Sequence, residues 1–143
     1  MEKIWGFAPW LGRFILAAFA LIFTLISLRF IPDPVRAAAA SGVTLSSPMG
    51  VAIARIGFGA FPLGCAAYAI MCLVSTQRLL AGLTFVSTMV SVVLAVRILG
   101  IAVDHTVGGA SVPLAAEILL LALSVFGLSA EMARRRRSLA DAA

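Results

Sequence analysis

Charged residues are scarce in this sequence, and acidic ones are the scarcest. Only 12% of the 143 residues are charged and six are acidic, whereas 62% are hydrophobic. A water-soluble domain carries about twice that share of charge. The mean hydropathy of +1.12 indicates that the apolar residues are not confined to one anchor. Most of the chain is therefore predicted to lie in lipid or against other lipid-embedded helices.

Residues that carry enzymatic chemistry are also few. The chain has one histidine, His105, and two cysteines, Cys65 and Cys72. On one helix these thiols would lie roughly 10 Å apart along the axis, too far for a disulfide. The sequence contains no glycine-rich phosphate loop, no histidine cluster and no Gly-x-Ser-x-Gly motif. We therefore expect a protein that is not an enzyme and holds no cofactor or metal.

Long apolar segments make up most of what is present. Crossing ~30 Å of hydrocarbon takes ~20 helical residues. Four segments of about this length follow one another, at 10–30, 48–74, 79–103 and 112–132. Pro32 and Pro34 interrupt the chain after the first, and Ser47 followed by Pro48 suits the start of the second. The predicted fold is one all-α membrane domain over residues 1–143, a four-transmembrane-helix bundle.

Basic residues are distributed unevenly between the two ends of these spans. Seven would lie on one side: Lys3, Arg13, Arg78, Arg134, Arg135, Arg136 and Arg137. Arg29 and Arg36 would lie on the other. Because cytoplasmic flanks retain positive charge, both termini are predicted to be cytoplasmic, with a basic tail at 133–143. Topology accounts for the net charge of +5 without nucleic acid, and the four tail arginines would also attract anionic lipid at the membrane surface.

The first apolar segment has an alternative interpretation as a cleaved signal peptide. Lys3 precedes it and the alanines at 37–40 follow it. A signal peptide, however, has a short apolar core with small residues directly behind it. Here the apolar run is long enough to span, and Arg29 and two prolines separate it from the alanines. It is predicted to be a retained span.

Several charged residues lie inside or at the edge of the spans, where each costs roughly 2.5–3.5 kcal/mol unless satisfied. They are Arg55, Arg97, Asp104 and Glu117, with His105 beside them. Arg55, Arg97 and Glu117 would each lie within ~10 Å of the outer ends of their helices. We expect a polar layer in the outer leaflet that holds an anionic or polar ligand, with Glu117 between the two arginines. The alternative is that these side chains snorkel or pair only to satisfy themselves.

Patterns of small residues predict how the spans pack. The second span has a stripe at helical spacing: Ala52, Arg55, Gly59, Pro62, Ala66 and Ala69. The third has a seam of Thr84, Thr88, Ser91 and Ala95. Pro62 should kink the second helix. Between the first two spans, Asp33 can cap a short surface helix at about 34–40, which is either a connector or a lid over the polar layer.

The arrangement of these residues resembles a known family. The residues that carry the resemblance are Ile31-Pro32-Asp33-Pro34, Ser47-Pro48, Arg55, Gly57, Gly59, Gly64, Arg97, Gly100, Asp104 and Glu117. The chain is similar to the small bacterial membrane proteins grouped as domain of unknown function 4345, which are in turn similar to the DoxX-like group. The resemblance implies a four-helix bundle in a bacterial inner (plasma) membrane. It carries no established activity, substrate or catalytic residue.

The main functional hypothesis is an uncharacterised, non-enzymatic membrane protein that acts through the charged layer. It would bind a small anionic or polar ligand or a lipid head group, or support a complex. Its expected partners are the lipid bilayer and either a second copy of the chain or another membrane protein. One alternative is a small oligomeric ion-coupled transporter that uses Glu117, although transport sites usually lie near the midplane. A second is a redox enzyme subunit, by analogy with the DoxX-like group.

The topology can be tested with reporter fusions. Fusions at Thr76 and Ala143 should report a cytoplasmic location, and fusions at Gly42 and Gly109 an external one, because the basic flanks stay inside. A cytoplasmic signal at Gly42 would contradict the four-span arrangement.

Overall fold

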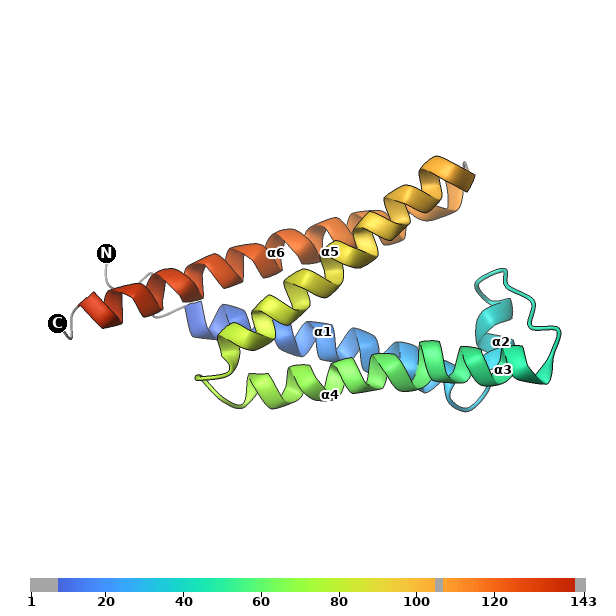
Figure 1. The fold of residues 1–143 in the computed structure, drawn as a ribbon, viewed down its shortest axis with the longest axis horizontal. Helices are drawn as coiled ribbons and strands as arrows, with labels where there is room; N and C mark the ends of the chain where they lie inside the picture. Colours follow the sequence, from blue (N-terminus) through green and yellow to red (C-terminus); the bar gives the residue numbers. More distant parts are fainter. Residues whose placement is uncertain (1–7, 105–106, 141–143) are drawn as a thin grey trace. The chain divides into compact units, whose positions relative to one another are not determined.

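The computed structural model describes residues 8–104 and 107–140, and this part of the chain is helical without strands (Figure 1). Its elements are α1 (Ala8–Phe30), α2 (Pro34–Ala39), α3 (Pro48–Ala54), η2 (Arg55–Ala60), α4 (Phe61–Leu73), α5 (Leu79–Asp104) and α6 (Val107–Ala140). Four helical segments are long and apolar enough to cross a membrane: Pro9–Phe30, Pro48–Leu73, Leu79–Val103 and Pro113–Ala140. The all-α class and the four candidate spans are confirmed, while the orientation of the termini stays a prediction.

Local signals determine where α2 and α3 begin. The Asp33 side chain accepts a hydrogen bond from the Arg36 main-chain N–H at 3.0 Å, directly before the proline that opens α2. Ser47 accepts one from Gly50 N–H at 3.0 Å and caps α3 in the same way. After α2 the chain turns through Gly42, whose φ of +76° is strained for residues with a Cβ. The short helix predicted after Asp33 is therefore present.

The second candidate span contains an irregular turn. Residues Arg55–Ala60 form the π-helix η2, and the N–H of Phe61 bonds to the carbonyl of Ile56, five residues earlier. Pro62 follows immediately and has no N–H to give the Phe58 carbonyl its α-helical bond. A wider turn therefore lies directly on the N-terminal side of the proline, while the kink predicted at Pro62 stays a prediction. Such turns often lie at functional positions.

The last helix is longer than predicted. We expected it to span 112–132 and to end before the arginines, but α6 begins at Val107 and runs to Ala140, about two turns further. No glycine or proline follows Gly127 to stop it, and alanine, leucine, glutamate and arginine favour helix. Basic side chains in the last turns also interact favourably with the helix dipole. The basic tail is therefore helical as far as Ala140.

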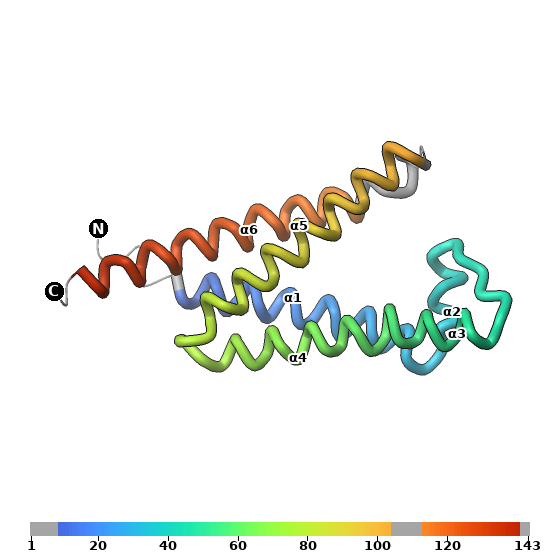
Figure 2. The backbone as a smooth tube through the Cα atoms, viewed as in Figure 1, coloured from blue at the N-terminus to red at the C-terminus, as the bar shows by residue number. Residues whose placement is uncertain are grey.

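The chain divides into two compact units. One contains the described residues up to Leu16 and those from Cys72 onward, and the other contains Ala17–Met71. In the first unit, α5 and α6 pack on each other, as the tube in Figure 2 shows. In the second, α2 contacts α3. The expectation that they act as a single membrane domain stays a prediction.

A tight contact in the first unit joins the start of α1 to the start of α5. Leu16, Leu79 and Leu83 are fully buried there. A Cβ on Gly82 would lie 2.6 Å from Cys72 Cβ and 2.9 Å from Leu16 Cδ1, closer than real Cβ atoms approach other atoms. Only glycine fits at position 82, so this close contact depends on a residue without a side chain.

The buried faces differ in part from the predicted ones. In the second span, four residues of the predicted stripe are buried: Gly59, Pro62, Ala66 and Ala69. Ala52 and Arg55 are exposed instead. In α5 the predicted seam is exposed, and the buried residues include Leu79, Leu83, Val86 and Val90. The Thr84 and Ser91 hydroxyls donate to carbonyls four residues earlier, at 2.9 and 2.8 Å, so neither needs a partner on another helix.

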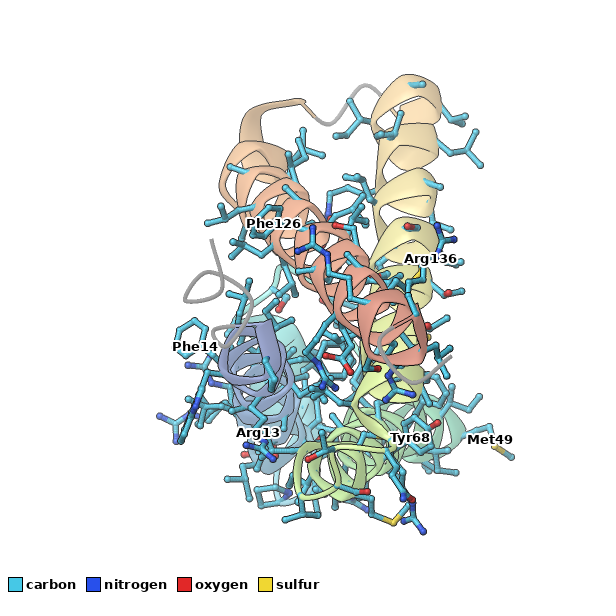
Figure 3. All side chains as sticks on the ribbon, turned by 90° about the vertical axis from the view of Figure 1, so that its left-hand side faces the viewer. Arg13, Phe14, Met49, Tyr68, Phe126 and Arg136 are labelled. Atoms are coloured by element: carbon cyan, nitrogen blue, oxygen red, sulfur yellow. The ribbon has the colours of Figure 1, made fainter. Side chains whose placement is uncertain are left out.

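Large apolar side chains are exposed on both units. Figure 3 labels Phe14 and Phe126 in the first unit and Met49 in the second, and each is more than half exposed. Isolated surface hydrophobes are ordinary in soluble proteins, but here they occur on helices of span length. This is the pattern expected where lipid replaces water around a helix.

The glycine contact gives a stability prediction. Gly82→Ala should lower the free energy of unfolding in detergent by about 1–3 kcal/mol, because the Cβ of Cys72 is fixed to its backbone and cannot rotate away. Gly64→Ala is the matched control, since nothing lies within 4 Å of its added Cβ. Thermal unfolding should show no loss for the control. Equal losses for both variants would contradict the contact.

Candidate functional site

Arg97 on α5 and Glu117 on α6 form a two-pronged ion pair. Nε of Arg97 donates to Oε2 of Glu117, and Nη2 donates to Oε1, each at 2.6 Å. The side chains are 32% and 17% exposed. A planar guanidinium matches a carboxylate in this geometry, which makes the contact specific as well as strong. The predicted contact between these two residues is present.

The ion pair reduces the capacity of this position to bind an anion. Both oxygens of Glu117 already accept hydrogen bonds from Arg97, so each charge has a partner within the pair. Charges in an apolar setting are tolerated when paired in this way. Within the first unit the pair therefore acts as a clasp between two long helices. Its role as a ligand site stays a prediction.

The other residues predicted for the charged layer are Arg55, Asp104 and His105. Arg55 is exposed, and its Nε donates to the Ile31 main-chain carbonyl at 2.9 Å. Carbonyls at the end of a helix lack an intrahelical donor, and Arg55 supplies one just after α1. Its sharing of Glu117 with Arg97 stays a prediction. The Asp104 side chain and His105 lie outside the described residues.

A second cluster of arginines and a carboxylate was not predicted. Glu131 on α6 is fully buried and accepts two hydrogen bonds from Arg134, at 2.8 and 2.7 Å, and one from Arg135 Nε at 2.9 Å. Nη2 of Arg135 also donates to the carbonyls of Thr76 and Gln77, at 2.9 and 3.0 Å. The cluster thus joins α6 to the connection before α5. The spacing of Glu131 to arginines three and four residues later was the signal that could have identified it.

The four tail arginines therefore do not form a uniform group. Arg134 and Arg135 are held by Glu131, while Arg136 is exposed on α6 and labelled in Figure 3. Arg137 is also exposed. Their predicted attraction to anionic lipid at the membrane surface stays a prediction. Glu131 already offsets part of the charge that Arg134 and Arg135 would contribute to it.

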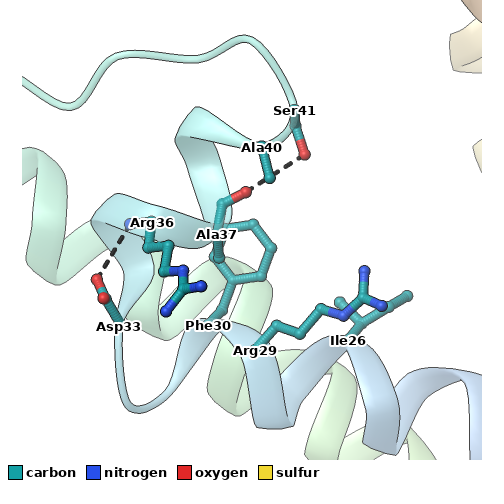
Figure 4. A pocket seen from close by; sticks show the side chains of 8 residues that line it. All are labelled: Ile26, Arg29, Phe30, Asp33, Arg36, Ala37, Ala40 and Ser41. Carbon is teal, nitrogen blue, oxygen red and sulfur yellow. Dashed lines mark hydrogen bonds between the residues drawn. The ribbon is translucent and has the colours of Figure 1, made fainter.

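A pocket of about 500 Å³ lies in the second unit, between the end of α1 and α2 (Figure 4). We call it the α1–α2 pocket. Its polar lining is Arg29, Asp33, Arg36 and Ser41, and its apolar lining is Ile26, Phe30, Ala37 and Ala40. In Figure 4 Arg36 extends from α2 towards Phe30 at the end of α1. The predicted topology places both arginines outside, but their meeting in one pocket was not predicted, because they belong to different helices.

The charges of this pocket are not balanced. Two arginines and one aspartate line it, and neither arginine forms an ion pair with any side chain that the structure describes. Asp33 Oδ1 accepts its hydrogen bond from the main chain of Arg36 and not from that residue's guanidinium. The α1–α2 pocket therefore presents a net positive charge to any group that enters it.

Three contacts within the second unit hold the end of α1 in place. The Arg55 side chain bonds to the Ile31 carbonyl, and the rings of Phe30 and Phe58 lie 5.1 Å apart. At Gly59, an added Cβ would lie 2.9 Å from Ile31 Cγ1. All three contacts come from η2, so the π-helix faces the corner from which Arg29 and Phe30 line the α1–α2 pocket. Arg55 thus acts as a positioning residue through Ile31.

The site offers hydrogen-bond donors but no set of residues for covalent chemistry. Guanidinium groups donate, remain charged and bind phosphate or carboxylate groups. No group of three His, Cys, Asp or Glu side chains in the described part of the chain is placed to hold a metal ion. The free thiols of Cys65 and Cys72 are buried and do not line the α1–α2 pocket. Binding an anion is what this arrangement can do.

The clasp can be measured by a double-mutant cycle. Glu117→Gln should destabilise the protein in detergent by leaving Arg97 without its carboxylate, and adding Arg97→Gln should recover part of the loss. The expected coupling is roughly 0.5–3 kcal/mol in thermal or denaturant unfolding. The same cycle with Arg55→Gln provides the comparison. Additive effects for Arg97 and Glu117 would contradict the clasp.

Comparisons with protein-family models, with curated proteins and with solved structures found no match. The resemblance to the domain of unknown function 4345 and DoxX-like groups therefore stays an expectation. The basis for assigning a function is the geometry of this chain's own residues.

Proposed function

We propose that this chain is a non-enzymatic, multi-pass protein of a bacterial inner membrane that binds a small anionic group in the α1–α2 pocket. The observation that carries the proposal is the pair of guanidiniums, from Arg29 and Arg36, that share this pocket without a carboxylate partner in the described part of the chain. In the clasp the Arg97 donors are taken up by Glu117, whereas no described carboxylate pairs with the arginines of the α1–α2 pocket.

The size and lining of the pocket support a small ligand. Ligand pockets commonly enclose about 300–1,000 Å³ and combine apolar walls with a few polar groups that fix orientation. The α1–α2 pocket, of about 500 Å³, has this composition. Arginine side chains from two helices line it, and hydrogen bonds to a charged group contribute more than neutral ones.

The position of the pocket along the chain supports binding at the membrane boundary. Arg29 lies in the last turn of α1, where the candidate span Pro9–Phe30 ends, and α2 begins four residues later. With the termini in the cytoplasm, as the positive-inside rule favours, the α1–α2 pocket would open on the outer side. Basic residues favour the cytoplasmic side of a membrane, so Arg29 and Arg36 on the outer side oppose the predicted orientation. Binding an anion would explain why they are kept there.

The alternatives have less support from the described side chains. Ion-coupled transport would require Glu117 to exchange partners, although Arg97 occupies both of its oxygens. Redox chemistry would require a cofactor site or a dithiol, and Cys65 and Cys72 are separate buried thiols. Association with a second copy or another membrane protein is compatible with anion binding and stays a proposal.

The proposal predicts a selective loss of binding. Arg29→Gln and Arg36→Gln should each weaken binding of inorganic phosphate by about tenfold or more, since each removes a charge-assisted donor worth about 1.5–3 kcal/mol. Equilibrium dialysis with radiolabelled phosphate, at low salt and in non-ionic detergent, would measure it. Arg78→Gln is the matched control, because it removes the same charge from an exposed loop residue outside the pocket. An equal loss in the control would indicate non-specific electrostatics and contradict the proposal.

A further inference from the structure

We propose that the anion bound in the α1–α2 pocket is the phosphate of a glycerophospholipid whose acyl chain lies along α1. This inference rests on the proposed function and specifies its ligand. It follows from three properties of the pocket: its two-part lining, its continuity with an apolar helix face, and its charge.

The lining divides into a polar and an apolar part. Arg29 and Arg36 supply the guanidiniums, whereas Ile26 and Phe30 present hydrocarbon and aromatic surface to the same space. A free phosphate ion keeps its hydration and gains nothing from an apolar wall. An amphiphile satisfies both parts, because its phosphate replaces water at the arginines and its glycerol and first methylenes cover the apolar residues.

The apolar part continues along α1 towards the middle of the span. Ile22, Ile26 and Phe30 are four residues apart and so lie on one face of the helix. Ile22 is 44% exposed and Ile26 is half-buried. All three belong to the candidate span that ends at Phe30, while Arg29 lies in its last turn. An acyl chain that follows this face stays at the depth of hydrocarbon while its phosphate reaches the guanidiniums at the boundary.

The charge of the pocket fits a phosphodiester. Two guanidiniums and the Asp33 carboxylate leave one net positive charge in the lining, which one phosphodiester anion neutralises. A phosphate monoester with two negative charges would leave one negative charge in the pocket without a partner. Oδ1 of this residue already accepts a hydrogen bond from the Arg36 N–H, while its second oxygen can accept one from a hydroxyl or ammonium of a head group.

Three matched probes separate the parts of such a ligand. Dihexanoyl phosphatidylglycerol has both phosphate and chains, inorganic phosphate has no chains, and dihexanoylglycerol has no phosphate. Binding to the purified full-length protein in non-ionic detergent is measured by native mass spectrometry with each probe titrated. We expect phosphatidylglycerol to bind at least about tenfold more tightly than either partial probe, since polar and apolar contacts are made together.

Two sets of variants locate the binding. Replacing both Arg29 and Arg36 by Gln should reduce phosphatidylglycerol affinity by about tenfold or more, and leave dihexanoylglycerol unaffected. Ile26→Gln should reduce phosphatidylglycerol affinity by about tenfold, whereas Leu25→Gln, an exposed neighbour on α1 outside the pocket, should not. Ile26→Ala and Leu25→Ala give the same comparison if a glutamine prevents folding, as judged by thermal unfolding.

The outcomes distinguish the two proposals. Inorganic phosphate could bind as tightly as phosphatidylglycerol, with an affinity that falls when both arginines are replaced but not in the Ile26 variants. The α1–α2 pocket would then be an anion site but not a lipid site. That result would overturn the present inference and leave the proposed function standing. If no probe responds to the arginine variants, both proposals are wrong. Stronger binding of phosphatidylglycerol that depends on both arginines and Ile26 would support both.

Discussion

Hydrocarbon does not solvate charge, so a charged side chain within a membrane span has to be satisfied by another part of the protein. In lipid there is also little hydrophobic force to draw apolar helices together, which leaves close packing and polar contacts to determine how they meet. Both described carboxylates on α6, Glu117 and Glu131, are held by arginine forks. Arg97 comes from α5, and Arg135 also holds two carbonyls in the connection before α5. These few charges thus attach α6 to α5 and its preceding connection, beside the close packing of Gly127 against Ile15.

Much of this could be predicted from the sequence, because the relevant constraints are local or one-dimensional. Span length follows from bilayer thickness, and Asp33 and Ser47 indicate where the helices that they cap begin. The contact between Arg97 and Glu117 followed from their equal predicted depth in the membrane. Two antiparallel spans joined by a short turn bring residues at the same depth side by side. The sequence did not predict which face of each helix is turned towards its neighbours. The exposed side of α5 and the direction of Arg55 depend on which neighbour offers a partner, and that is a three-dimensional property.

The α1–α2 pocket and the Glu131 cluster were missed for different reasons. Glu131 could have been paired with Arg134 and Arg135 by spacing, but the four arginines were interpreted as one block of surface charge. Its full burial depends on contacts that spacing does not show. Arg29 and Arg36 are brought to one pocket by the turn between α1 and α2, which contains two prolines and the Asp33 cap. The irregular η2 turn then holds that corner through Ile31 and Phe30, a contact that helical periodicity could not predict because a π-helix departs from it.

The arginines of this chain are best understood by what each one binds. Those beside Glu117 and Glu131 neutralise carboxylates, and Arg55 satisfies a carbonyl at a helix end. A single guanidinium on an open surface is satisfied by water and needs no further explanation. Arg29 and Arg36 differ from all of these, because they line one pocket whose single carboxylate, Asp33, pairs with neither of them. Arg29 and Arg36 are also the two basic residues that the predicted topology places outside, against the rule that orients the other flanks. The proposed anion site would explain why two basic residues are kept on the side that the insertion signal disfavours.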